Sequence, residues 1–166
     1  MYGQLSLFPG AGKVALPCTP PSRGEIAELE AAMVAAAAAA DPDFAPGCTD
    51  AIAPVRHHFA PGLYAREIFL PAGTRIVGKI HRTAHLMTVV AGSGFLWNEF
   101  AAYEYRAPFT HLTTPGAKNV LWVREDSIIV TYHPTTLTDL AAIEREIIAT
   151  DYDQLPAPAA SKEMLT

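Results

Sequence analysis

Apolar and polar residues alternate over short stretches between Ala53 and His133, and these stretches are rich in β-branched and aromatic residues. Pro and Gly separate them, a pattern that predicts β-strands joined by tight turns. The turns are expected at 61–62, 71–73, 92–94 and 115–116. Strands with no helix between them predict a closed or double-sheet antiparallel architecture. The predicted strands cover residues 54–59, 63–70, 74–81, 86–91, 94–99, 103–107, 110–114, 120–124 and 127–133.

A helix is predicted over residues 23–40, before the strand-rich region. Ser22 and Glu25 have the spacing of a capping box, in which each side chain satisfies a free backbone donor at the helix start. Alanine, the best helix former, dominates the segment. Its one apolar stripe consists of Ile26, Leu29 and Met33.

Helical spacing returns after the last predicted strand. Thr136 and Asp139 form a second, looser capping box, and a helix is predicted over residues 139–149. We expect this amphipathic helix to pack on the barrel. Its apolar face consists of Leu140, Ile143 and Ile147.

The chain is expected to form one domain, because 166 residues, half of them apolar, suffice for a single core. Residues 1–50 would form a Pro-rich arm and the first helix, and 53–133 the β-barrel. The second helix would lie within 136–150, followed by a flexible tail over 151–166. The arm and the apolar strand edges predict a homo-oligomer, most simply a homodimer.

Charge argues against nucleic acid as a partner. The 12 Lys and Arg residues against 17 Asp and Glu give a formal charge of -5, with no basic cluster among aromatics. Arg66 and Glu67 are expected to be solvated or ion-paired surface. No membrane span is expected, because the longest apolar run, 31–40, is about half the ~20 residues required. With no secretory signal, and Cys18 and Cys48 outside the strands, the sequence predicts a cytoplasmic protein.

One stretch of the strand region carries candidate chemistry. Five residues separate Gly73 from Lys79, and one residue separates Lys79 from His81. Three residues separate His81 from His85, and six separate His85 from Gly92. In an extended strand the side chains of Lys79 and His81 share a face. A tight turn after His81 would bring His85 beside it, so these residues predict a polar pocket at the mouth or in the interior of the barrel.

These spacings resemble the first motif of the cupin superfamily: a Gly, five residues, His-x-His, three or four residues, Glu, six residues and a Gly, with three ligands to one metal ion. Lys79 stands where the first His would be, His81 matches the second His, and His85 stands at the Glu position. The resemblance implies an all-β, single-domain cupin-type jelly roll, or double-stranded β-helix, here with an N-terminal and a C-terminal α-helix.

Residues 114–116 followed by Asn119 resemble the second cupin motif, Pro-x-Gly-x-x-His, with Asn119 in place of the remaining ligand. Segments 57–67 and 132–135 are similar to those of small cupin-like proteins in bacteriophage and prophage genomes. That resemblance implies that a phage-encoded protein of this kind acts in the cytoplasm of its host cell.

The first functional hypothesis is a metal-dependent enzyme acting on a small molecule. Two imidazoles and a third N or O donor suffice to bind Zn, Fe, Ni or Mn. The third ligand to an ion held by His81 and His85 would be His133, Asn119 or His111, whichever the barrel turns inward.

Lys79 supports different hypotheses, because an ammonium beside the histidines repels a divalent cation. His81, His85 and Lys79 would then form a metal-free catalytic site that holds a phosphate or carboxylate or transfers a proton. A non-catalytic phage accessory module, binding a small anionic ligand or a host protein, is the alternative. The histidines can also be structural, hydrogen-bonded to each other and to the backbone. The candidate acids for proton transfer are Tyr64, Tyr103 and Tyr132.

Overall fold

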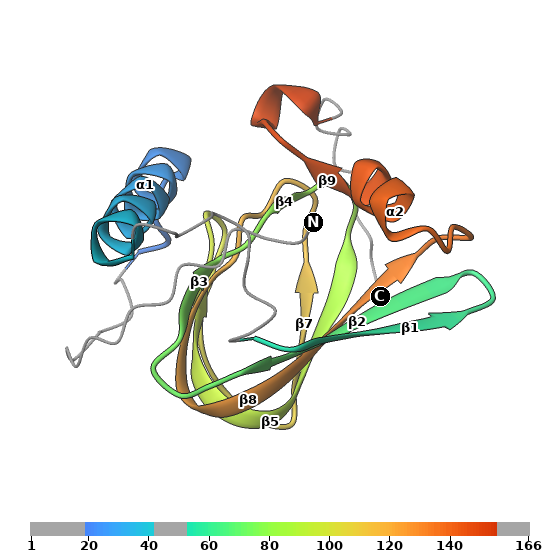
Figure 1. Cartoon of the computed structure of the whole chain (residues 1–166), viewed down its shortest axis with the longest axis horizontal. Coiled ribbons are helices and arrows are strands. Elements are labelled where there is room, and N and C mark those ends of the chain that lie inside the picture. The colour runs from blue at the N-terminus through green and yellow to red at the C-terminus, as the bar shows by residue number, and fades with distance from the viewer. Residues whose placement is uncertain (1–18, 42–52, 156–166) are drawn as a thin grey trace.

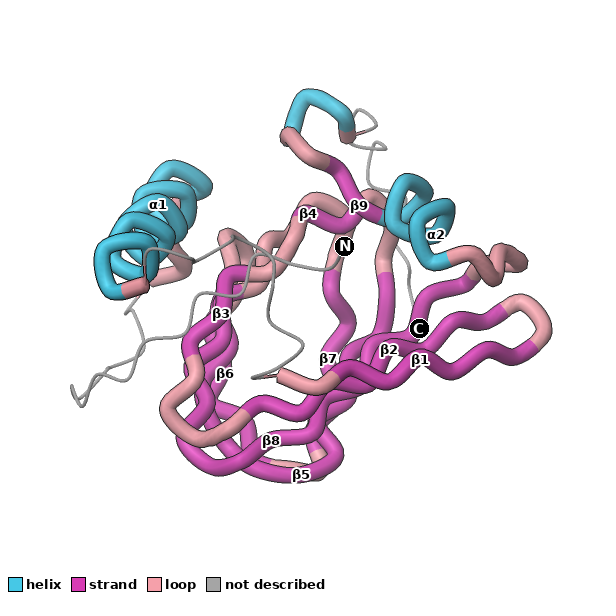
Figure 2. Tube along the Cα trace, in the orientation of Figure 1, coloured by secondary structure: helices cyan, strands magenta, loops and turns pink. Residues whose placement is uncertain are grey.

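The computed structural model describes residues 19–41 and 53–155 (Figures 1 and 2). The described part is mostly antiparallel β-sheet with two α-helices. Predictions for the N-terminal arm, Cys18, Cys48 and residues 156–166 lie outside this part. The elements are α1 (Arg23–Ala40), β1 (Val55–Ala60), β2 (Leu63–Leu70), β3 (Arg75–Val77), β4 (Ile80–His81), β5 (His85–Trp97), β6 (Ala102–Arg106), β7 (Phe109–Thr113), β8 (Val120–Pro134), α2 (Leu140–Ile147), β9 (Ile148–Ala149) and the short 3-10 helix Tyr152–Gln154.

Two long strands, β5 and β8, form the spine of the sheet. They pair antiparallel along most of their 13 and 15 residues and bend together, as Figure 1 shows. On one side of the bend β2 pairs with β8 and β7 with β5; on the other, β3 pairs with β8 and β6 with β5. The side chains on the concave face of this folded sheet therefore face one another across an interior.

The bend explains why two strand predictions fail. Residues 86–91 and 94–99 were expected as separate strands, but β5 continues through the predicted turn at 92–94. Register shifts between Val89 and Gly94 mark β-bulges, which let a strand bend without ending. Gly92 has φ 90°, and a Cβ there would collide with Ser127 and the carbonyl of Asp126. The predicted strands 120–124 and 127–133 are likewise one strand, β8.

Helix α1 has the predicted capping box at Ser22 and Glu25 and packs at the β3 side of the sheet. Its apolar stripe differs from the expected one, because Leu29 is exposed while Ala37 is buried. The contact cluster between α1 and the sheet consists of Ile26, Met33, Val77 and Val120, with Trp97 partly buried against it.

Helix α2 lies over the open end of the folded sheet (Figure 1). Asp139 is its N-cap and accepts a hydrogen bond from Ala142 N, so the expected Thr136 capping box does not form. The helix ends at Ile147, two residues before the predicted end, because β9 pairs with β4. Its apolar face packs against Tyr64 through Ile143 and Ile147, with Leu140 and Ile148 partly buried.

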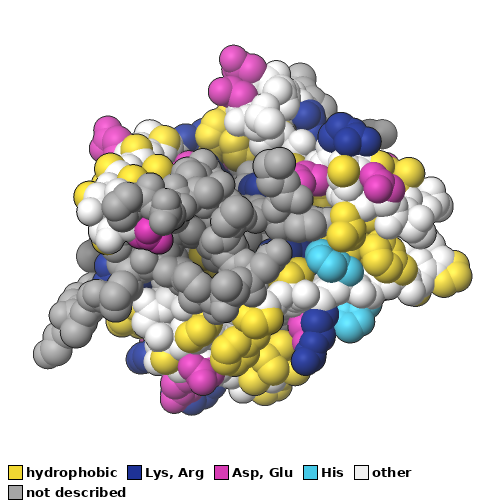
Figure 3. All heavy atoms as spheres, in the orientation of Figure 1, with side chains coloured by type: hydrophobic (Ala, Val, Ile, Leu, Met, Phe, Trp, Pro, Cys, Tyr) yellow, Lys and Arg dark blue, Asp and Glu magenta, His cyan; other side chains and the backbone are white. Residues whose placement is uncertain are grey.

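The surface of the described residues has mixed charge. On the face shown in Figure 3, acidic and basic side chains are interspersed rather than gathered by sign. Among the described residues, no helix has the length and apolar character needed to cross a bilayer. Within residues 151–155 the Arg82 guanidinium donates hydrogen bonds to the backbone carbonyl and the side-chain oxygen of Gln154.

Candidate metal centre

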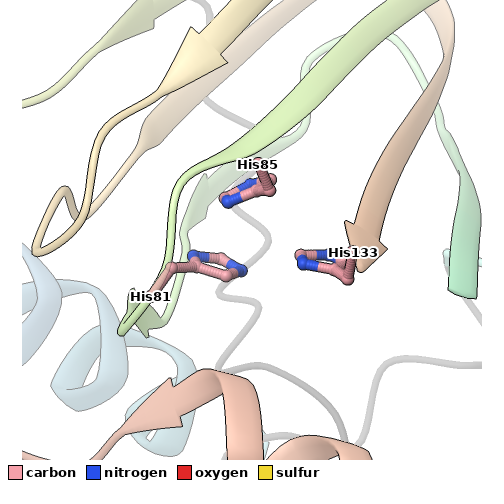
Figure 4. Close-up of side chains that lie close together, drawn as sticks. All are labelled: His81, His85 and His133. Carbon is pink, nitrogen blue, oxygen red and sulfur yellow. The ribbon is translucent and has the colours of Figure 1, made fainter. Parts of the chain in front are cut away.

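Three histidines from three strands converge at the end of the folded sheet that α2 covers. His81 ends β4, His85 begins β5, and His133 lies near the end of β8. One nitrogen of each ring lies within 4.8 Å of the others. The ring centroids are 4.1 Å apart for His81 and His85, 4.6 Å for His85 and His133, and 5.5 Å for His81 and His133. Figure 4 shows the rings turned toward one another.

Backbone pairing holds these strands in place. The bend after His81 is tied down by a hydrogen bond from Arg82 N to the Ile147 carbonyl, next to the β4–β9 pair. The chain then turns back, so His85 enters β5 beside His81. In the β5–β8 register Leu86 lies opposite Tyr132, which puts the flanking residues His85 and His133 on the same inward face.

All three imidazoles are held in their neutral form. Burial, together with the nearby His85 and His133 imidazoles and the Arg66 charge, lowers the pKa of His81 well below its ordinary value of 6.5. Burial is also the main cause that lowers the pKa of His85 to about 4 and that of His133 to about 3. Neutral imidazole is the form that binds metal ions, so near pH 7 the cluster presents three ready donors.

The donor set fits a transition metal. The Nδ1 atom of His133 is buried and lacks a hydrogen-bond partner among the described residues. Backbone hydrogen bonds with Lys79 and Thr83 act on His81 and His85. Buried polar atoms normally have partners, so the His133 nitrogen, beside two further imidazoles, favours a bound species. Three imidazoles fill three positions of a four-coordinate ion and leave one for water or another ligand. Nitrogen donors favour Zn, Fe, Ni or Mn over Mg or Ca.

Lys79 is placed differently from the sequence expectation. The predicted strand 74–81 is broken into β3 and β4, and Lys79 lies in the gap between them. It lines the same cavity as the histidines, but its ammonium forms an ion pair with Glu144 on α2. The catalytic role expected of Lys79, His81 and His85 stays a prediction.

Asn119 also lines the cavity, but its amide takes part in a buried network. Its Oδ1 accepts a hydrogen bond from Asn98, and its Nδ2 donates to Thr113. His111, another candidate ligand, lies on β7 against the ring of Tyr103, with centroids 4.9 Å apart.

Of the three candidate tyrosines, Tyr64 is the one that lines the cavity. It is 1% exposed, and its ring stacks on His133 with centroids 5.9 Å apart. Its hydroxyl lies 2.8 Å from Nδ1 of His57, a half-buried residue on β1. This pair can carry a proton between the cavity and the edge of the β1–β2 hairpin.

The cavity beneath the histidines has a volume of about 140 Å³. Arg66 lines it, although the sequence suggested that Arg66 lies at the surface. The alternation of side chains along β2 could have predicted this position. Every second residue of a strand points to the same face, and the residues on this face are Tyr64, Arg66, Ile68 and Leu70. The apolar part of the wall consists of Ile68, Leu70, Ile76, Val77, Met87, Leu121, Ile129, Ile143, Ile147 and Ile148.

No protein-family profile matches the chain, and no curated protein matches it in sequence. Several solved structures are similar to part of the chain. A salicylate 1,2-dioxygenase from Pseudaminobacter salicylatoxidans is 12% identical (TM-score 0.47) over 57% of this chain and only 28% of the dioxygenase. A cupin-2 domain protein from Rhodospirillum rubrum is 13% identical (TM-score 0.45; 57% of this chain, 72% of that one).

A predicted oxalate decarboxylase from Thermotoga maritima is 12% identical, with a TM-score of 0.43 over 50% of this chain and 81% of that one. Because these TM-scores are low, the structural similarities assign neither a family nor a ligand to this chain.

Proposed function

We propose that this chain is a cupin-type jelly roll that binds a divalent transition metal, Zn, Fe, Ni or Mn, through His81, His85 and His133, and acts on a small molecule in the cavity beneath. The convergence of three neutral imidazoles carries this proposal. It departs from the cupin motif in taking its third ligand from the end of β8 rather than from Lys79 or Asn119.

A metal held here would supply Lewis-acid activation of a bound oxygen. The chain's own residues supply the rest of the site. Helix α2 covers the cavity with Ile143 and Ile147 and limits the access of water. Tyr64, stacked on His133 and hydrogen-bonded to His57, is positioned to give or take a proton at the wall.

Metal analysis of the purified full chain tests the proposal. We expect one transition metal ion per chain, or one equivalent taken up on titration of chelator-treated protein. His81→Ala, His85→Ala and His133→Ala should each reduce binding by at least about tenfold. His111→Ala is the matched control, because this half-buried histidine lies outside the cluster. Uptake that is absent, or that is unchanged in all three variants, would contradict the proposal.

An enzyme and a non-catalytic accessory module would use the same cavity. Turnover of a bound molecule would distinguish the enzyme from the module. The homodimer and the cytoplasmic location stay predictions; a monomer mass in light scattering would reject the homodimer.

A further inference from the structure

His81 is held less firmly by its own strand than the other two histidines of the cluster. His85 and His133 lie in β5 and β8, which pair with each other along most of their lengths. His81 ends β4, a strand of two residues whose partner β9 also has two (Figure 1). So short a pair of strands is marginally stable by itself. The position of the His81 ring therefore depends on further contacts around it.

Arg82, the residue after His81, makes several of these contacts. They run to residues 148–155, which follow α2 and are called the strap below. The Nε atom of Arg82 donates to the Ile148 carbonyl at 2.8 Å. Its two terminal nitrogens donate to the backbone carbonyl and to Oε1 of Gln154, at 2.6 and 2.7 Å. Arg82 therefore joins the bend after His81 to both ends of the strap.

The strap also contacts a second neighbour of His81. The His81 carbonyl accepts a hydrogen bond at 2.8 Å from Gly116 N, in the loop between β7 and β8. Gly116 packs so closely against the strap that a Cβ there would lie 2.9 Å from Cδ1 of Leu155. The strap thus acts on the His81 backbone through two residues, Arg82 and Gly116.

The strap itself is anchored to the rest of the fold at Tyr152. The Tyr152 hydroxyl donates to Oε1 of Glu99 at 3.2 Å. The Arg23 guanidinium lies over the Tyr152 ring, 4.1 Å from its centroid. The Glu99 side chain is only 7% exposed, so this anchor is shielded from water. An anchored strap can hold the Arg82 side chain in one position.

We propose that Arg82 is a positioning residue for the metal site: by binding the strap it fixes the backbone of His81, and so the direction in which the imidazole faces the ion. The inference rests on the proposed function, because it concerns the affinity of the same three-histidine site. A guanidinium stays protonated and cannot act as a metal ligand itself. The effect of Arg82 on the metal therefore passes through His81.

Zinc affinity of the full chain, measured by competition with a chelating dye, is the first test. Arg82→Ala should weaken zinc binding about tenfold, the lower end of the range for residues that orient a metal ligand. Arg82→Lys should recover part of the loss, because an ammonium can still donate to one strap carbonyl. Arg124→Ala is the control and should leave the affinity unchanged. This arginine pairs with Glu104 near the start of β8, whereas His133 lies near its end.

A double-mutant cycle distinguishes positioning from a general loosening of the fold. If Arg82 acts through His81, Arg82→Ala should have no further effect on zinc affinity in a chain that already carries His81→Ala. A loosened fold would still weaken the two-histidine site that remains. Cobalt in place of zinc gives a spectroscopic readout, because its visible absorption depends on the number and geometry of its ligands. The spectrum of Arg82→Ala should shift from that of wild type toward that of His81→Ala.

Gln154→Ala keeps the inference testable if Arg82→Ala does not fold. Gln154 is exposed, and its substitution removes one acceptor of the Arg82 guanidinium. It should weaken zinc binding about threefold, the effect of one hydrogen bond, and only where His81 is present.

Zinc affinity that is unchanged in Arg82→Ala, or in Gln154→Ala where Arg82→Ala does not fold, would overturn the inference and leave the metal site standing. A loss that persists undiminished in the His81→Ala background would do the same. A wild-type chain that takes up no zinc would refute the proposed function and this inference together.

Discussion

Lys79 and Glu144 form an ion pair between residues 65 positions apart in sequence, joining the loop between β3 and β4 to helix α2. Their side chains are 27% and 21% exposed. The pair has two effects: it holds α2 over the cavity, and it offsets the cationic charge that would otherwise repel a metal ion from the histidines.

Lys79→Met should therefore destabilise the fold by about 1–2 kcal/mol, because it removes the cation from a partly buried carboxylate. Urea denaturation would measure the loss. Arg56→Met breaks an exposed pair with Glu67 and should cost at most about 1 kcal/mol. Similar losses in the two variants would show that the Lys79 pair is worth no more than a surface contact.

The metal-free protein should lose stability as the pH falls below about 6.5. In the unfolded chain these imidazoles titrate near 6.5, whereas burial lowers the pKa of His85 to about 4 and that of His133 to about 3. Between the ordinary pKa of 6.5 and these lower native pKa values, the unfolded chain binds more protons than the native chain, so acid favours unfolding. Each imidazole contributes at most about 1.4 kcal/mol per pH unit.

Denaturation of chelator-treated protein between about pH 7.5 and about pH 5 would measure this slope. His133→Gln should reduce the slope, because it removes one of the groups that titrate differently in the two states. A slope that is the same in wild type and His133→Gln would contradict the assignment.

Gly92→Ala should destabilise the chain by more than Gly62→Ala. Both glycines have positive φ, 90° and 76°, so alanine is strained by about 1 kcal/mol at either position. A Cβ at Gly62 meets nothing within 4 Å, whereas one at Gly92 collides with Ser127 and the Asp126 carbonyl at the bend of the sheet. Thermal unfolding would show whether the extra loss, about 1–3 kcal/mol, occurs.

Local sequence patterns predicted where helices and strands occur better than they predicted where one strand runs on without a break. The capping box at Ser22 predicts the start of α1 because it depends on residues three apart. Gly92 predicts a turn equally well, yet here it permits a bulge inside β5, since pairing with β8 continues on both sides of it. Such pairing joins residues far apart in sequence, and no local signal reports it.

The same limit applies to the site. His81 and His85 could be paired from the sequence, because a short bend joins them. His133 was one of several candidate third ligands, and only the β5–β8 register places it beside them. Arg66 was misjudged because its neighbour Glu67 suggested a surface pair, although Tyr64, Arg66 and Ile68 alternate onto one face.

Asp139→Ala tests whether α2 works as a cover for the cavity. Asp139 caps α2 by accepting a hydrogen bond from Ala142 N, and its loss should destabilise the helix by about 1 kcal/mol. Hydrogen exchange of α2 amides should become faster. Water should also reach the cavity more readily, because Ile143 and Ile147 line it. Metal stoichiometry should not change, since no histidine ligand lies on α2.

Ser22→Ala is the matched control, because Ser22 caps α1 in the same way and none of its helix lines the cavity. It should lose similar stability and show faster exchange in α1 alone. Equally fast exchange of α2 amides in the two variants would mean that global stability, not the cap at Asp139, controls the cover formed by α2.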